Sequence, residues 1–309
     1  MDIVVTSLIT FLFTIIFTLS IIPFLKRFFL DIPNKRSSHL NATPSGGGLG
    51  FIIASFAISL RHSILLPVLS LPLAIVGFFD DLINLSPLKR IFVQTLTLLV
   101  FYYSSPLKNI LGEYYLLNII FMPLTLLLGI YLINIINFAD GLDGLLAGCM
   151  CIILFYYSIN IDKSFFPIFS ALLGFQVLNW EPAKVFMGDG GSTFLGAIYV
   201  GLIYYSNSFE QIFELLLLSF PLIFDTTITL FRRFLAGHNI FKAHKLHLFQ
   251  RIYQAGYSHR FVSTIYISAI SSIAIALSFK NLLATFIILI LIVCSGIYLD
   301  NKVAVPFSK

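Results

Sequence analysis

Carboxylates in this chain recur at the ends of strongly apolar segments. The stretch NFADGLDG, residues 137–144, places Asp140 and Asp143 between the apolar runs LTLLLGIYLINII and LLAGCMCIILFYYSI. The stretches GFFDDL and FMGDGGSTFLG place Asp80, Asp81 and Asp189 in similar positions. A carboxylate at the bilayer centre costs about 2.5–3.5 kcal/mol on insertion scales, so this group indicates a water-filled cleft or a bound cation. The alternative for any single acid is a helix cap or an anchor at the membrane interface.

A second group of residues could hold phosphate oxygens. The stretch DIPNKRSSHLNATPSGGGLGF carries Lys35, Arg36, Ser38 and His39 before a triple glycine that includes Gly47. Exposed amides at the start of a helix bind anions, although a triple glycine is more often only a flexible turn. The triple glycine alone is therefore weak evidence for a phosphate site.

The longest hydrophilic stretch, RRFLAGHNIFKAHKLHLFQR, carries His244, His247 and Arg251. If the segment is helical, spacings of three and four residues place these side chains on one face, where they could grip one anion. The histidine pair could also bind zinc, but every cysteine of the chain lies in an apolar run, where a small hydrophobic residue is the expected role. A basic loop that is merely attracted to anionic lipid is the plainer alternative.

Carboxylates on one side and cations or amides on the other suggest phosphoryl transfer. A divalent cation held by carboxylates neutralises a pyrophosphate, while basic side chains stabilise charge at the transferring phosphorus. The chain has no GxxxxGK(S/T) loop, which excludes a P-loop NTPase. Residues 140–147 match the start of the CDP-alcohol phosphotransferase signature, but Gly148 stands where that signature has an arginine.

The elements that must position these residues are membrane helices. The chain has 309 residues, of which 58% are hydrophobic and 11% charged, and its mean hydropathy is +0.96. A spanning helix needs roughly 20 apolar residues. About eleven such runs lie near residues 3–25, 49–60, 64–79, 91–104, 114–135, 144–160, 164–180, 192–206, 211–231, 261–279 and 282–299. We expect an all-α integral membrane protein, with residues 1–309 forming a single polytopic domain.

Basic residues predict the orientation of these helices. The first run follows an acid and lacks a cleavage site, so we interpret it as a retained helix. If Lys26 and Arg27 are cytoplasmic, only four of the 19 basic residues lie outside. These are Arg61, Lys108, Lys163 and Lys280. The N-terminus is then outside, the C-terminus is cytoplasmic, and an active-site cleft lies at the cytoplasmic face, formed by loops 26–48, 80–90, 137–143, 181–191 and 232–260. The net charge of +5 reflects this topology and anionic lipid, not a nucleic-acid partner.

Five motifs in order resemble those of the polyprenyl-phosphate N-acetylhexosamine-1-phosphate transferases. They are DIPNKRSSH, GFFDDL, NIINFADGLDG, FMGDGGSTFLG and AHKLHLFQR, and they span about residues 31–260. The chain looks more like the branch that initiates O-antigen or related envelope glycans than the branch that transfers a muramyl-pentapeptide. The resemblance implies transfer of a sugar-1-phosphate from a UDP-sugar to undecaprenyl phosphate, with release of UMP. It also implies Mg²⁺, or Mn²⁺, as cofactor and the cytoplasmic face of the inner membrane as the location.

The resemblance further implies a role for each matching residue. Asp80 would lie by the acceptor phosphate as its base, and Asn137, Asp140 and Asp143 would read the uridine. The implied catalytic residues are Asp80, Asp81, His244, His247 and Arg251; the implied substrate-binding residues are Lys35, Arg36, Ser38, His39, Gly47, Asn137, Asp140 and Asp143; the implied metal ligands are Asp189 and Asp81. Where the family often reads PTPRGGG this chain reads ATPSGGG, so any phosphate contact of that arginine is not expected at Ser45.

Several alternatives stay open at this point. A transporter or flippase would also carry intramembrane carboxylates, but the acids here gather at one end of the helices and no internal repeat is evident, so an enzyme is favoured. Asp225, within the run 211–231, either belongs to the family pattern or pairs with Arg232 or Arg233. The sequence does not identify the sugar among GlcNAc, GalNAc, QuiNAc and FucNAc, nor whether transfer is direct, nor whether the protein is a homodimer.

Overall fold

The computed structural model describes residues 2–33, 38–39, 41–107, 115–239 and 244–307. Lys35 and Arg36, expected at the substrate, lie outside the described residues. The helices are α1 (Ile3–Phe28), α2 (Leu49–His62), α3 (Leu65–Ile83), α4 (Pro87–Ser104), α6 (Tyr115–Phe138), α7 (Leu145–Asn160), α8 (Phe166–Asn179), α9 (Gly188–Tyr204), α10 (Phe209–Leu218), α11 (Phe220–Leu235), α12 (Leu248–Gln254), α13 (His259–Ser278) and α14 (Leu282–Lys302), with a 3₁₀ turn at Lys163–Phe165. Two short antiparallel strands, β1 (Leu30–Asp31) and β2 (Thr43–Pro44), complete the described elements.

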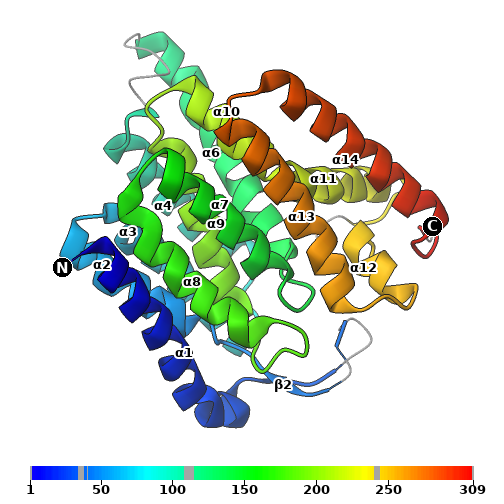
Figure 1. Ribbon diagram of the computed structural model, residues 1–309, viewed down its shortest axis with the longest axis horizontal. Helices are drawn as coiled ribbons and strands as arrows, with labels where there is room; N and C mark the ends of the chain where they lie inside the picture. The colour runs from blue at the N-terminus through cyan, green and yellow to red at the C-terminus, as the bar shows by residue number, and fades with distance from the viewer. Residues whose placement is uncertain (1, 34–37, 40, 108–114, 240–243, 308–309) are drawn as a thin grey trace.

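The predicted apolar runs coincide with helices of the bundle (Figure 1). Within the described residues, five helices are long and apolar enough to cross a bilayer, namely α1, α3, the Ile120–Phe138 part of α6, α13 and α14. The bent pair of α10 and α11 would make a sixth. An all-α, multi-pass membrane protein is therefore confirmed, while eleven crossings and the orientation of the termini stay predictions.

The break between α10 and α11 redirects the chain toward the site. The two helices meet at 67°, with Ser219 between them and Pro221 in the first turn of α11, where a proline needs no backbone donor. The Tyr199 hydroxyl contacts the Ser219 hydroxyl and donates to the Leu215 carbonyl at 3.1 Å. These bonds satisfy polar groups at the break inside an apolar bundle. The second half, α11, then carries Asp225 toward α12 and α13.

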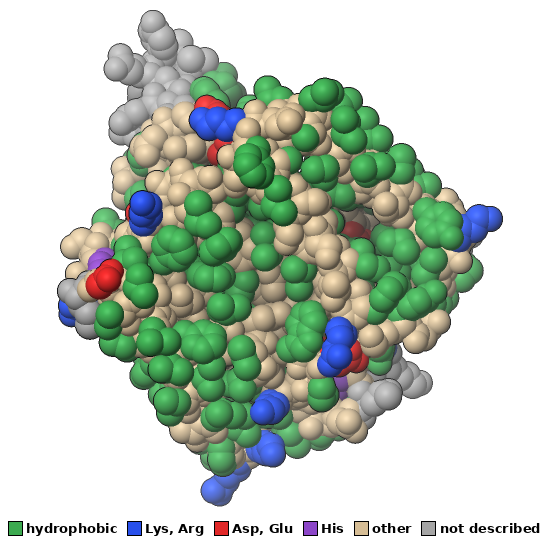
Figure 2. Space-filling model, in the orientation of Figure 1, with side chains coloured by type: hydrophobic (Ala, Val, Ile, Leu, Met, Phe, Trp, Pro, Cys, Tyr) green, Lys and Arg blue, Asp and Glu red, His purple; other side chains and the backbone are tan. Residues whose placement is uncertain are grey.

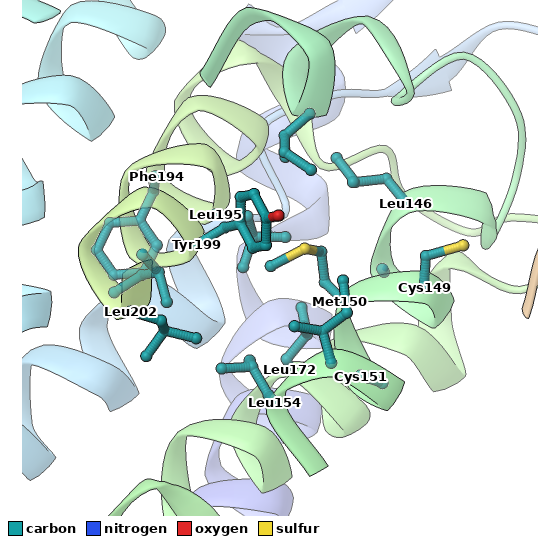
Figure 3. Packing of buried hydrophobic residues seen from close by; sticks show 14 of the residues in the cluster. Leu146, Cys149, Met150, Cys151, Leu154, Leu172, Phe194, Leu195, Tyr199 and Leu202 are labelled. Atoms are coloured by element: carbon teal, nitrogen blue, oxygen red, sulfur yellow. The ribbon is translucent and has the colours of Figure 1, made fainter. Parts of the chain in front are cut away.

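Helix α9 lies at the centre of the bundle. Every residue from Gly190 to Tyr204 is buried, and the helix packs against α3 and α6. Figure 3 shows its Phe194, Leu195, Tyr199 and Leu202 near apolar side chains of α7 and α8. Cys149 and Cys151 of α7 are buried, as expected for small hydrophobic residues. Because α9 is held on all sides, Asp189 in its first turn has a fixed position.

The outer surface suits a lipid environment. Figure 1 shows α1 and α14 at opposite edges of the molecule. Large hydrophobic side chains on both helices are exposed, including Ile16 on α1 and Phe286 on α14. Figure 2 shows hydrophobic side chains over much of one face, with charged side chains mostly near its margins. This distribution is that of a bundle whose outer faces contact acyl chains.

Candidate active site

A cavity of about 310 Å³ lies where α3, the α6–α7 loop, α9 and the start of α13 meet. Four of the five acids singled out in the sequence line it, namely Asp81, Asp140, Asp143 and Asp189. Its other polar lining includes Ser38, His39, Ser45, Asn179, Gln250 and His259. The structure thus brings together carboxylates from three separate motifs and two of the residues expected from loop 26–48.

Asp81 and Asp189 form the centre of the carboxylate group. The backbone N–H of Asp189 donates to both oxygens of Asp81, at 3.1 Å and 3.0 Å. Asn137 donates its side-chain amide to Asp189 Oδ1 at 3.1 Å and to Ser192 Oγ at 2.8 Å. Gly188 has a φ of +78°, and a Cβ there would lie 2.8 Å from Asp81 Oδ2. Glycine at this position therefore allows the start of α9 to approach the end of α3.

Asp80 differs from Asp81 because it forms an ion pair with an arginine of the same chain. Its Oδ2 lies 2.7 Å from Arg90 Nη1, and its Oδ1 accepts from the Leu85 amide at 2.7 Å. The Asp80 carboxylate also lies close enough to Asp189 for the two acids to repel each other. Arg90 was not singled out from the sequence, although its position in the basic loop 80–90 was a usable signal. It supplies a positive charge beside the acids.

The acids fit a magnesium ion that also binds the substrate. Among the described residues, no three His, Cys, Asp or Glu side chains are grouped so that they could hold a metal ion alone. Magnesium ions in phosphoryl-transfer sites are usually bound by one or two carboxylates together with substrate phosphates and water. Asp81 and Asp189 supply such hard oxygen donors at the cavity wall. Their role as metal ligands stays a prediction.

Asp140 lies in the α6–α7 loop, and its pKa is strongly raised. Burial, together with the carboxylates of Asp189, Asp81 and Asp143, raises the pKa of Asp140 to about 8. Crowded acids of this kind hold a proton until a cation arrives. The cavity is therefore prepared for a positively charged partner.

Asp143 has a different environment because a histidine holds it. Its Oδ1 lies 3.0 Å from His259 Nδ1, and its Oδ2 accepts from the Ala183 amide at 3.0 Å. His259 was missed in the sequence. The signal available was Ser258, whose side chain caps α13 by accepting from the Phe261 amide. A serine before an apolar run marks a helix start, so it placed His259 at the loop end of α13.

The triple glycine does not offer all of its amides to a ligand. Gly47 N–H donates to the Phe186 carbonyl at 2.9 Å, and Gly48 N–H donates to the Met187 carbonyl at 3.1 Å. A Cβ on Gly47 would lie 2.6 Å from Val185. The phosphate-binding role expected for Gly47 through its amide is therefore wrong in this structure. The glycines are needed because the loop packs directly against the segment before α9.

The histidine segment is not the continuous helix that its spacing suggested. Helix α12 begins at Leu248, so His244 and His247 precede it. The Leu246 amide donates to His244 Nδ1 at 3.2 Å, which leaves the proton on Nε2. Burial, with the nearby His247, Arg233 and His238, lowers the pKa of His244 to about 3. His244 is thus a neutral donor in the substrate-free protein and not the cation we expected.

His247 is packed and only partly satisfied. Its ring stacks on Phe249 with a centroid distance of 5.3 Å and lies 4.8 Å from the ring of His244. Its Nδ1 is buried without a hydrogen-bond partner among the described residues. A buried nitrogen without a partner is costly, so this atom is available to a bound ligand or water.

Arg251 lies elsewhere. Its side chain is 4% exposed and pairs with Asp300 of α14, and its Nη1 donates to the Val305 carbonyl at 2.9 Å. It lines a separate apolar cavity of about 560 Å³ between α11, α13 and α14. The expected stripe of His244, His247 and Arg251 on one helix face is therefore wrong.

Asp225 explains where α12 begins. Its Oδ1 accepts from the Leu248 amide at 2.7 Å, and its Oδ2 accepts from the Phe249 amide at 3.3 Å and from the Tyr266 hydroxyl at 2.7 Å. A carboxylate that accepts from the first amides of a helix stabilises its N-terminus. Of the two cations considered as partners of Asp225, Arg232 pairs with Asp300 at 2.6 Å and Arg233 donates to the Asn239 carbonyl at 2.6 Å.

Comparison with known proteins agrees with this arrangement. The model of glycosyl transferase family 4 matches residues 63–207, which contain the carboxylates from Asp80 to Asp189. A probable undecaprenyl-phosphate N-acetylglucosaminyl 1-phosphate transferase of Bacillus subtilis is 32% identical, over 97% of this chain and 95% of its own length.

More distant similarity covers a shorter part of the chain. A phospho-N-acetylmuramoyl-pentapeptide-transferase of Streptococcus agalactiae is 32% identical over 60% of this chain and 65% of its own length. Another phospho-N-acetylmuramoyl-pentapeptide-transferase, from Staphylococcus saprophyticus, is 29% identical over 78% of this chain and 88% of its own length. Because the motifs, the cavity that they line and a relative of nearly full length agree, this chain belongs to glycosyl transferase family 4 and is a phosphosugar transferase enzyme.

Proposed function

We propose that this protein transfers a sugar-1-phosphate of the N-acetylhexosamine type from a UDP-sugar to undecaprenyl phosphate and releases UMP. The product is a polyprenyl-diphosphate sugar, made in the first membrane step of O-antigen or a related envelope polysaccharide. The observation that carries the proposal is the single cavity lined by Asp81, Asp140, Asp143 and Asp189. Membership of an enzyme family decides against the transporter or flippase alternative.

The reaction exchanges one phosphoanhydride partner for another. An oxygen of the acceptor phosphate attacks the sugar-bearing phosphorus of the donor, and the bond from that phosphorus to the UMP oxygen breaks with its electrons going to UMP. A magnesium ion, or Mn²⁺ in its place, would supply positive charge to the pyrophosphate when held by Asp81 and Asp189. Transfer then depends on positioning and charge.

We favour direct attack over an aspartyl intermediate. Asp80 would be the covalent nucleophile or the base, but Arg90 and the Leu85 amide engage both of its oxygens. An acceptor phosphate is already a nucleophile and does not need a second one. Asp80 is better suited to hold Arg90 beside the phosphates, where that cation stabilises developing charge.

The histidine segment would add a hydrogen-bond donor for the phosphates of the substrate. His244 is neutral with its proton on Nε2, so it can donate a hydrogen bond to a phosphate oxygen. A bound phosphate would raise the pKa of His244 and strengthen that bond. We place the reaction at the cytoplasmic face of the inner membrane, because the cavity is built from helix ends that the basic-residue distribution assigns to the cytoplasm.

The direct test is product formation by the purified protein. A panel of UDP-sugars assayed with undecaprenyl phosphate and Mg²⁺ should release UMP and give a lipid-linked sugar from at least one donor. Asp189→Asn should lose at least about tenfold of this activity and of Mg²⁺ affinity, because an amide cannot offset the pyrophosphate charge. Near-normal turnover with unchanged Mg²⁺ dependence in that variant would remove Asp189 from the site. No UMP release from any donor would overturn the proposal.

A further inference from the structure

His259 connects three segments that line the carboxylate cavity. Its Nδ1 lies 3.0 Å from Asp143 Oδ1 and 3.1 Å from the Asp143 amide nitrogen. Its Nε2 lies 2.9 Å from the Ser38 carbonyl oxygen. The side chain is 7% exposed, and its ring packs edge-on against Tyr253 with a centroid distance of 4.4 Å. The ring therefore has one fixed orientation between α13, the α6–α7 loop and the loop before α2.

The hydrogen-bond partners determine what the ring can do. A carbonyl oxygen only accepts, so Nε2 carries a proton and donates to Ser38. At Nδ1, the Asp143 carboxylate requires a proton on the ring, whereas the Asp143 amide requires a lone pair. A protonated Nδ1 donates to the Asp143 carboxylate, and an unprotonated Nδ1 accepts from the Asp143 amide. The contact with Asp143 therefore does not depend on the charge of His259.

Other bonds complete the fixation of this corner of the cavity. Ser263 Oγ donates to the Asp143 carbonyl at 2.8 Å. The Glu181 carboxylate accepts from the His259 amide at 3.3 Å and from the Arg260 amide at 2.6 Å. The start of α13, the loop after α8 and the α6–α7 loop thus form one hydrogen-bonded unit. Asp143 is the residue that contacts both α13 and the loop after α8.

We propose that His259 is a positioning residue for the donor nucleotide, acting by holding Asp143 and the Ser38 carbonyl in the cavity wall. This inference rests on the proposed function and on the uridine-side role that the family resemblance implies for Asp143. Asp81 accepts from the Asp189 amide and Asp189 accepts from Asn137, whereas the His259 ring contacts Asp143 and the Ser38 carbonyl. Loss of His259 should therefore weaken donor binding more than it slows transfer.

The test separates binding from turnover. His259→Ala in the purified full-length protein should weaken UMP binding, measured by calorimetry, about tenfold, which is the scale of one lost hydrogen bond to a charged group. The KM for the UDP-sugar turned over in the panel should rise by a similar factor, with kcat within about threefold of wild type. The UMP affinity of His259→Gln should lie between those of wild type and His259→Ala, because the glutamine amide can replace one of the two contacts of the ring. His62→Ala, at the end of α2, is the matched histidine control and should leave both values unchanged.

A double-mutant cycle shows whether His259 acts through Asp143. The double variant of His259→Ala and Asp143→Ala should bind UMP as weakly as Asp143→Ala alone. Additive losses, or an unchanged UMP affinity in a folded His259→Ala, would overturn the inference. If His259→Ala does not fold, the same measurements on His259→Gln decide.

The same measurements keep the two proposals apart. Wild-type protein that binds UMP but transfers nothing would overturn the proposed function and leave the positioning test in force. Wild-type protein that transfers sugar phosphate while His259→Gln and His259→Ala bind UMP normally would overturn only the positioning role. Wild-type protein that does not bind UMP would overturn both.

Discussion

At the scale of single residues, charge in the cavity is set by proximity among acids. Asp81, Asp140, Asp143 and Asp189 line one space, but only Asp143 faces a histidine. Asp81 accepts from the Asp189 backbone amide. Asp140 is surrounded by the other carboxylates. The acids are thus not equivalent, and Asp140 is one whose charge changes with pH near neutrality.

The first prediction concerns the proton on Asp140. With a pKa of about 8, this carboxyl is mostly neutral at pH 6.5 and mostly charged at pH 9. Magnesium affinity should therefore increase as pH rises through about 8, because the cavity gains a negative charge. Calorimetric titration of the substrate-free protein with Mg²⁺ over this range measures the effect. Asp140→Asn should weaken the dependence around pH 8, and equal slopes there in variant and wild type would contradict the assignment.

Residue types and motif order predicted four acids that share the cavity, although Asp80 does not line it and Asp31 does. They were not sufficient for Arg251, because spacing places side chains on one face only if the segment is helical throughout. The helix begins at Leu248, where Asp225 accepts from its first amides, and Asp225 lies 23 residues earlier in the chain. A long-range cap of this kind leaves no local pattern. His259, the partner of Asp143, lies 116 residues away, so no local pattern links the two side chains.

At the scale of elements, the end of α14 holds α11 and α12 together. Asp300 pairs with Arg251 of α12 and with Arg232 of α11. The ring of Phe307 also lies against both guanidinium groups. Its centroid is 5.6 Å from Arg251 Cζ and 5.7 Å from Arg232 Cζ. Since α12 directly follows the histidine segment, this brace determines where His247 lies. The last helix therefore supports the site without lining the carboxylate cavity.

The second prediction concerns this brace. Removing one member of a buried ion pair costs about 3–5 kcal/mol, because the remaining charge has no partner. Asp300→Ala should therefore lower the melting temperature of the purified protein strongly. Arg232→Ala should be milder, since the Arg232 side chain is 39% exposed and leaves the pair of Asp300 with Arg251 intact. Equal losses from the two substitutions would show that the buried pair is not the stabilising contact.

At the scale of the whole molecule, the sequence predicted the helices better than the number of crossings. Helices occur at the expected apolar runs, but α2 and α7 are short, and the run 211–231 is divided between α10 and α11. Apolar composition predicts burial, yet it does not separate a helix in lipid from one inside the bundle. The central α9 illustrates this, since its apolar residues face neighbouring helices. Orientation depends on charge asymmetry instead.

The last prediction tests that orientation. In a Cys294→Ser background, which removes the exposed native thiol, an impermeant maleimide should label Lys163→Cys and Glu210→Cys in intact cells. Lys184→Cys and Ala255→Cys, at exposed positions of the loops beside the cavity, should react only after the cells are permeabilised. The reason is the basic-residue count, which leaves only four of 19 basic residues outside in this topology. Labelling of Lys184→Cys in intact cells would place the cavity on the outer face. A cavity there would have no access to a cytoplasmic nucleotide sugar, so this result would contradict the proposed donor as well as the topology.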